Sequence, residues 1–81
     1  MLIVARVLVV PPINPEALRG LRLKDGYSVA GFAREIGIVP SHLSNIEAGR
    51  RGCSPAIVKR MAEVLAVPIS ALLWRRAEDV A

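Results

Sequence analysis

The sequence predicts a mostly α-helical domain of five short helices preceded by an N-terminal β-strand. Three observations lead to this fold class. Helix-capping residues and glycine stops recur along residues 14–81, apolar side chains there repeat at helical spacing, and β-branched residues dominate the first ten positions. With 81 residues the chain has room for one compact domain. We expect a strand and proline linker over residues 1–13 and a helical domain over residues 14–81.

The first ten residues alternate in a way that predicts a strand with one buried face. The odd positions are all apolar, whereas Arg6 lies on the even side. Pro11 and Pro12 then end the hydrogen-bonding ladder. No other segment favours a strand, so the simplest partner is a second copy of the chain. The alternative is a leader that frays or packs onto its own subunit. The predicted dimerisation residues on the odd face are Ile3, Ala5, Val7 and Val9.

Capping residues, prolines at first helical positions and glycine stops divide the rest of the chain into helices. Apolar residues at helical spacing give each helix an inner side. The expected helices are Pro15–Asp25, Val29–Ile36, Pro40–Ala48, one that begins at Ser54-Pro55, and a short one from Pro68 to Trp74. The expected core is Leu18, Leu21, Phe32, Ala33, Ile36, Leu43, Ile46, Val58, Met61, Ala62 and Leu65.

Composition excludes several classes of function. The single cysteine, Cys53, and the single histidine, His42, provide neither a disulfide nor a zinc cluster, so we expect no metal, no cofactor and a reducing cytoplasm. The apolar run over residues 1–10 has half the ~20 residues that a membrane span needs, so we expect no membrane partner. Ser41 and His42 diverge as neighbours on a helix, so we expect no enzyme and no small-molecule substrate. The chain is basic, with a net charge of +4. Because a chain this short buries only ~60% of the surface that its unfolded form exposes, we expect no deep catalytic cleft and favour a binding module over an enzyme.

Two short helices joined by a glycine-containing turn lie between Ser28 and Gly49. This is the spacing of the unit that places its second helix in the major groove of DNA. The runs FAREIGI over residues 32–38 and PSHLSNIEAGRR over residues 40–51 resemble the Cro and lambda-type repressor family of XRE-type helix-turn-helix proteins. The resemblance covers residues 18–73. It implies a five-helix lambda-repressor-like domain in which Val29–Ile36 is the positioning helix and Pro40–Ala48 the recognition helix.

The outer side of the recognition helix supplies the candidate base contacts. Leu43 and Ile46 are expected to face the core, so the remaining side chains point away from it and the N-terminal ones reach deepest into the groove. Asn45 can pair two-fold with adenine, although a solvated helix residue is the alternative. His42 can contact bases, or phosphate and sugar alone. The candidate base contacts are Pro40, Ser41, His42, Ser44 and Asn45.

Candidate phosphate contacts flank this helix. Arg50 and Arg51 follow it directly, and Lys24 ends the first helix. The backbone N–H groups of Ser28 and Val29 form an anion site at a helix N-terminus. Because the family usually has glutamine where Val29 stands, we expect the two arginines to carry more of the contact. Their alternative is an ordinary solvated loop.

The resemblance also implies a structural ion pair between Arg22 and Glu47, which would hold the recognition helix to the first helix. It implies a sequence-specific transcriptional regulator that binds double-stranded DNA as a homodimer. The expected site is a pseudo-palindromic operator, and the expected protein is a Cro-like or phage-type repressor of the bacterial cytoplasm or nucleoid. The alternative is an antitoxin or other interaction module whose apolar strand binds a partner protein.

Overall fold

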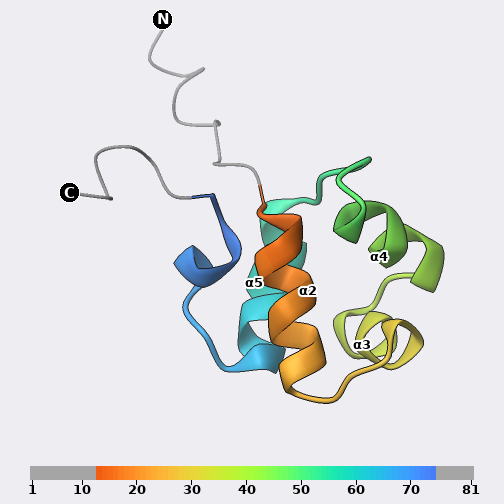
Figure 1. Cartoon of the computed structure of the whole chain (residues 1–81), viewed down its shortest axis with the longest axis horizontal. Helices are drawn as coiled ribbons and strands as arrows, with labels where there is room; N and C mark the ends of the chain where they lie inside the picture. Colours follow the sequence, from red (N-terminus) through yellow and green to blue (C-terminus); the bar gives the residue numbers. More distant parts are fainter. Residues whose placement is uncertain (1–12, 75–81) are drawn as a thin grey trace, which may run out of the picture.

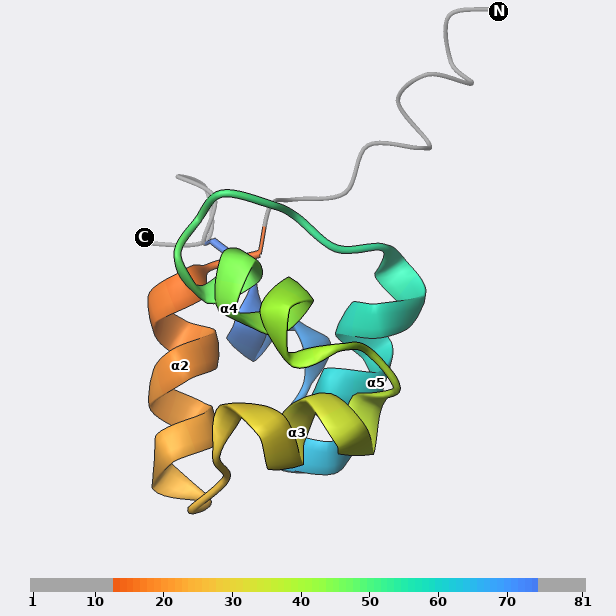
Figure 2. The same ribbon diagram turned by 90° about the vertical axis from the view of Figure 1, so that its right-hand side faces the viewer.

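The computed structural model describes residues 13–74, which fold as four α-helices and one turn of 3-10 helix (Figure 1). Viewed from the side of α4, α2 and α5 lie on opposite flanks, with α3 and α4 in front and η1 behind (Figure 2). No helix within these residues is long and apolar enough to cross a membrane. The elements are α2 (Pro15–Lys24), α3 (Val29–Ile36), α4 (Pro40–Glu47), α5 (Pro55–Leu65) and η1 (Ile69–Leu72).

Capping explains where the α-helices begin. Asn14 Oδ1 accepts hydrogen bonds from two amides of the first turn of α2, at 3.1 and 3.3 Å. Ser28 and Ser54 each accept one from the amide three residues further on, at 2.9 and 3.3 Å. α4 follows Val39, whose side chain makes no capping hydrogen bond. Pro40 occupies its first position, where a missing N–H costs nothing.

The last helix, predicted from Pro68 to Trp74, is shorter than expected and is not α-helical. Only Ile69–Leu72 are helical, in a single 3-10 turn. The reason is a pairing with the residues just before α2: Leu73 forms an isolated antiparallel bridge with Ile13, and the Asn14 N–H donates to the Leu72 carbonyl at 2.8 Å. An extended Leu73 cannot continue a helix, so the helical turn ends before it. Two other helices end one residue earlier than expected, α2 and α4.

The predicted N-terminal strand lies outside the described residues, together with its predicted dimerisation residues Ile3, Ala5, Val7 and Val9. Within residues 13–74 the Ile13–Leu73 bridge is the one β pairing. Ile13, which the sequence division assigned to the linker, is 8% exposed and belongs to the core. Ile13 therefore packs with the helices although the first helix begins only at Pro15.

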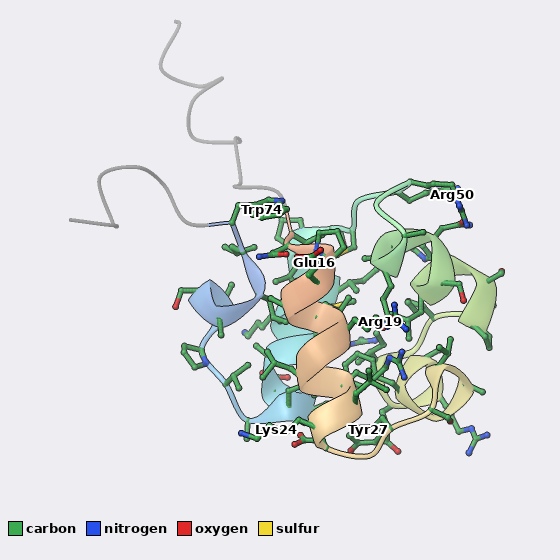
Figure 3. The ribbon with its side chains drawn as sticks, in the orientation of Figure 1. Glu16, Arg19, Lys24, Tyr27, Arg50 and Trp74 are labelled. Carbon is green, nitrogen blue, oxygen red and sulfur yellow. The ribbon has the colours of Figure 1, made fainter. Side chains whose placement is uncertain are left out.

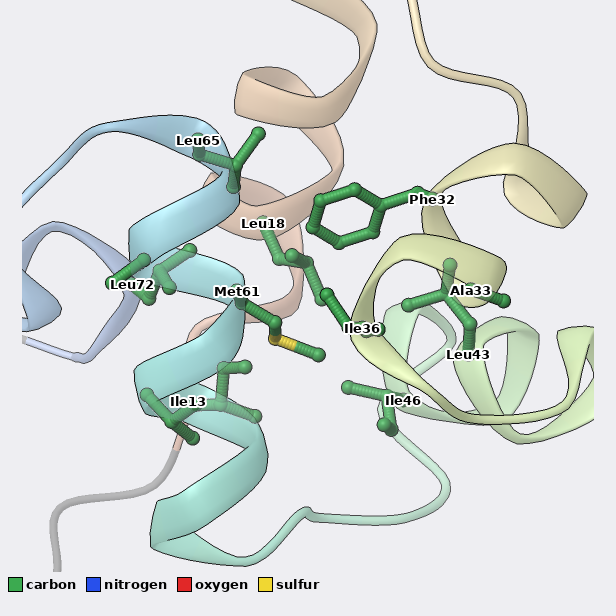
Figure 4. Close-up of a cluster of buried hydrophobic side chains, with 12 residues drawn as sticks. Ile13, Leu18, Phe32, Ala33, Ile36, Leu43, Ile46, Met61, Leu65 and Leu72 are labelled. Atoms are coloured by element: carbon green, nitrogen blue, oxygen red, sulfur yellow. The ribbon is translucent and has the colours of Figure 1, made fainter.

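The core lies between the helices and draws side chains from every element (Figure 4). Of the eleven positions predicted to face inward, all but Leu21 are buried, and Leu21 is half-buried against them. Phe32 from α3 and Met61 from α5 are fully buried in its centre. The buried set is Ile13, Leu18, Phe32, Ala33, Ile36, Leu43, Ile46, Val58, Met61, Ala62, Leu65 and Leu72.

The turn between α3 and α4 depends on Gly37. Its φ of 80° is left-handed, a conformation that side chains disfavour. A Cβ added there would lie 2.8 Å from Arg60 Nη1. Arg60 in turn donates to the Ile36 carbonyl at 3.1 Å, at the C-terminal end of α3. The turn that sets the direction of α4 is therefore stabilised by the left-handed backbone at Gly37 and by the Arg60 side chain of α5.

Replacing Gly37 by alanine should lower the free energy of unfolding by about 1–2 kcal/mol, because alanine is strained in the left-handed region. Arg60 would also have to move away from Ile36. Urea unfolding followed by circular dichroism measures the loss. Gly20, inside α2 with no neighbour within 4 Å of an added Cβ, is the matched control. Its replacement by alanine should raise stability by about 0.5–1 kcal/mol, and equal effects at both positions would contradict the strain argument.

Candidate nucleic-acid interface

α4 presents one side to the core and the other to solvent. Leu43 and Ile46 are fully buried. At 100° per residue, Ser41 points most directly away from them, with Ser44 and Asn45 on either side of it. The two serines are exposed and Asn45 is half-buried. These three side chains therefore form one polar surface, which we call the outer face of α4.

The two remaining candidate base contacts lie at the edges of the outer face. Pro40 is exposed beside the turn from α3, and His42 is half-buried on the opposite flank of the helix. Helix geometry places each of them about 70–90° from the buried side. The structure thus groups Ser41, Ser44 and Asn45 in the centre and leaves Pro40 and His42 at the margin.

Arg22 and Glu47 form a bidentate ion pair between α2 and α4. Arg22 Nε lies 2.6 Å from Glu47 Oε2 and Arg22 Nη2 lies 2.9 Å from Glu47 Oε1. The side chains are only 7% and 9% exposed. Arg22 Nη1 also donates to the Tyr27 carbonyl at 2.8 Å, so all three nitrogens of the guanidinium are used. The hydrogen bond and the charge of Glu47 raise the pKa of Arg22 above its usual value, against the opposing effect of burial.

The same pair shapes the electrostatics of α4. Glu47 is the one carboxylate in the sequence of α4, and its charge is neutralised beside α2. The outer face consequently carries hydroxyl and amide groups and no negative charge. A surface of this kind can approach a polyanion without electrostatic repulsion and can exchange hydrogen bonds with it.

The cations predicted to contact phosphate do not share one surface. Arg50 and Arg51 are exposed in the loop that follows α4. In Figure 3 Arg50 projects on the same side of the domain as α4, whereas Lys24 projects from the far side of α2. The structure therefore brings Arg50 to the outer face of α4 and separates Lys24 from it.

The side chains at the N-terminus of α3 stabilise the helix itself. Ser28 Oγ accepts from the Gly31 N–H at 2.9 Å, and the Val29 side chain packs against the core. The amides of Val29 and Ala30 precede the first hydrogen bonds within the helix, so they remain available as donors. Any contact with an anion here would come from the backbone.

Arg19 is a candidate that the sequence analysis missed. It lies four residues after Pro15 and three before Arg22, on one face of α2. Pro15 lies against Gly49, with 3.9 Å to a Cβ placed on that glycine, and Arg22 binds Glu47. Arg19 therefore faces the C-terminal end of α4, and Figure 3 shows it on that side. The sequence feature that could have identified Arg19 is its spacing of three residues from Arg22 on the same helix.

Three comparisons identify the family of this fold. Residues 16–73 match the family described as a helix-turn-helix domain. The chain is 36% identical over 61 residues to the HTH-type transcriptional repressor RghR of Bacillus subtilis, covering 74% of this chain and 45% of RghR. Its structure is similar to that of SinR, the master regulator for biofilm formation, in complex with DNA, with a TM-score of 0.70, 28% identity and coverage of 74% and 100%.

A further similar structure is the restriction-modification controller protein C.AhdI from Aeromonas hydrophila, with a TM-score of 0.69, 27% identity and coverage of 73% and 89%. Because the family match spans most of the chain, this protein belongs to the helix-turn-helix domain family. The resemblance to XRE-type helix-turn-helix proteins is confirmed. The chain spans less than half the length of RghR.

Glu47→Ala should lower the free energy of unfolding by about 3 kcal/mol, because it leaves the Arg22 guanidinium nearly buried without its carboxylate. Urea unfolding measures the change. Glu63→Ala is the control, an exposed carboxylate on α5 without an ion pair in the described part of the chain, and should change stability by less than about 0.5 kcal/mol. The double variant Arg22→Met, Glu47→Leu should recover most of the loss. Similar losses for Glu47→Ala and Glu63→Ala would show that the ion pair contributes little.

Proposed function

We propose that this protein is a sequence-specific regulator that binds double-stranded DNA with α4 in the major groove. The observation that carries the proposal is the outer face of α4, which is polar and carries no carboxylate. The one carboxylate of α4, Glu47, is paired with Arg22. The major groove is about 12 Å wide and admits a helix of this kind. Hydroxyl and amide groups are the donors and acceptors that read base edges there.

In this proposal the centre of the outer face reads bases and its margins contact the backbone. Ser41 lies in the first turn of α4 and enters deepest, and Ser44 and Asn45 follow on either side of it. His42, half-buried at one edge, is placed for phosphate or sugar, and Pro40 for the methyl group of a thymine. Base recognition then depends mainly on three small polar side chains.

Phosphate contacts would hold α4 in the groove from two directions. Arg50 and Arg51 follow its C-terminal end, and Arg19 lies on the same side of the domain. The amides at the N-terminus of α3, at Ser28, Val29 and Ala30, supply uncharged donors from another element. Such contacts fix the position of the domain on the duplex but do not read sequence. Lys24, on the far side of α2, is left out of this set.

We further propose that the protein acts as a homodimeric repressor in the bacterial cytoplasm or nucleoid, of the Cro-like or phage type. The relative RghR is named a repressor, which supports the direction of regulation. Two copies of α4 related by a dyad would bind half-sites about 34 Å apart and require a pseudo-palindromic operator. Occupying that operator would exclude polymerase or a competing regulator.

Fluorescence anisotropy with duplexes selected from a random pool tests DNA binding. The dimer should show a slope of log affinity against log salt near −5, from about three phosphates per subunit. Asn45→Ala should relax preference at one position of each half-site at a cost of about 1–3 kcal/mol. Arg51→Ala should weaken every duplex alike. A slope near zero, or equal affinity for all sequences, would refute the proposal.

Deleting residues 1–10 should reduce dimerisation and leave the helical signal unchanged, because the predicted strand lies before the first residue of the core, Ile13. Sedimentation velocity and circular dichroism measure the two properties. A dimer of unaltered affinity would place the interface elsewhere. A full-length chain that is monomeric at all concentrations would instead support the interaction-module alternative.

A further inference from the structure

Arg50 is attached to Asn45 by backbone and side chain together. The Arg50 N–H donates to the Asn45 carbonyl at 2.9 Å, and the Arg51 N–H donates to the same oxygen at 3.3 Å. Gly49, at a φ of 78°, turns the chain back over the last turn of α4. The Arg50 side chain then reaches Asn45 Oδ1 from Nε, at 3.0 Å. Arg50 is therefore held beside the outer face of α4.

This hydrogen bond fixes the orientation of the Asn45 amide. A guanidinium group can only donate hydrogen bonds, so the group turned toward Arg50 must be the amide oxygen. The Asn45 Nδ2 group then points away from Arg50, toward the open side of the helix. The oxygen keeps a second lone pair, but any base that approaches it also meets the N–H groups of Arg50.

Together the two side chains present mostly donors. Adenine offers N7 as an acceptor and its N6 amino group as a donor in the major groove, so its two-fold pairing with asparagine requires a free amide oxygen. Guanine offers two acceptors, N7 and O6. The N6 amino group of adenine would find the Asn45 oxygen already engaged by Arg50, whereas the acceptors of guanine can accept from the Asn45 Nδ2 group.

We propose that Arg50 is a positioning residue for Asn45 and determines its base preference, so that the pair selects guanine over adenine. This inference rests on the proposed function and deepens it. An asparagine with a free amide oxygen at position 45 would prefer adenine. The hydrogen bond from Arg50 engages that oxygen and reverses the base preference. Arg50 thus contributes to specificity through another side chain and is more than a phosphate contact.

Arg51 provides the matched control. It is the next residue, exposed like Arg50 and of equal charge. Within residues 13–74, its side chain makes no hydrogen bond, so its removal changes the charge of the loop without freeing Asn45. Both arginines are on the surface, and the alanine variants should fold as the parent does, which circular dichroism verifies.

The experiment uses the full chain and a duplex selected by it from a random pool. Asn45→Ala first identifies the position whose base preference depends on residue 45. The four bases are then compared at that position for the parent chain, Arg50→Ala and Arg51→Ala. The parent should prefer guanine, Arg50→Ala should shift the guanine-to-adenine ratio toward adenine by about tenfold, and Arg51→Ala should weaken all four duplexes equally.

Three results would overturn the inference while leaving DNA binding intact. One is a parent chain that already prefers adenine at this position. Another is an Arg50→Ala variant whose affinities fall in parallel, as expected for Arg51→Ala. The third is a guanine-to-adenine ratio that differs between Asn45→Ala and the double variant Asn45→Ala, Arg50→Ala. The effect of Arg50 must pass through Asn45, so these two variants should have the same ratio. If the parent chain selects no duplex at all, the proposed function fails together with this inference.

Discussion

The ion pair between Arg22 and Glu47 fixes the position of α4, and the proposed interface depends on it. α4 has eight residues and no side-chain cap, and helices of this length are marginal on their own. Its buried contacts, Leu43 and Ile46, lie one turn apart and define a line about which the helix can roll. The fork between Arg22 and Glu47 acts to one side of that line, so it opposes the roll.

The same guanidinium links α4 to more than one element. Arg22 belongs to α2, and its third nitrogen binds the carbonyl of Tyr27 in the turn before α3. The Tyr27 ring packs against Phe32 of α3, with ring centroids 5.4 Å apart. α2, the turn before α3, and α4 are therefore tied together at one side chain. This arrangement allows the polar side chains of the outer face to lie on a short helix and still hold a defined position.

Most of the body was predictable because its determinants are local. Caps and apolar spacing located α2 to α5 and their buried sides, and the family resemblance implied the pairing of Arg22 with Glu47. The 3-10 turn was not predictable, because Leu73 is extended by a pairing with Ile13, sixty residues earlier. The side on which Lys24 projects depends on which flank of α2 carries α4, and the sequence of α2 does not determine that. The bond between Arg50 and Asn45 requires the fold of the loop, which only the structure provides.

Of the four large apolar side chains exposed within residues 13–74, Ile69 and Trp74 lie away from the outer face of α4, whereas Val39 directly precedes α4. Ile69 and Trp74 are 43% and 50% exposed. They belong to or follow η1, on the opposite side of the domain from α3 and α4 (Figure 1). Ile13, where the N-terminal segment joins the body, pairs with Leu73 beside Trp74. A protein contact at this apolar end would leave the outer face of α4 accessible. A dimeric regulator requires that separation, since its two copies must bind each other and DNA at the same time.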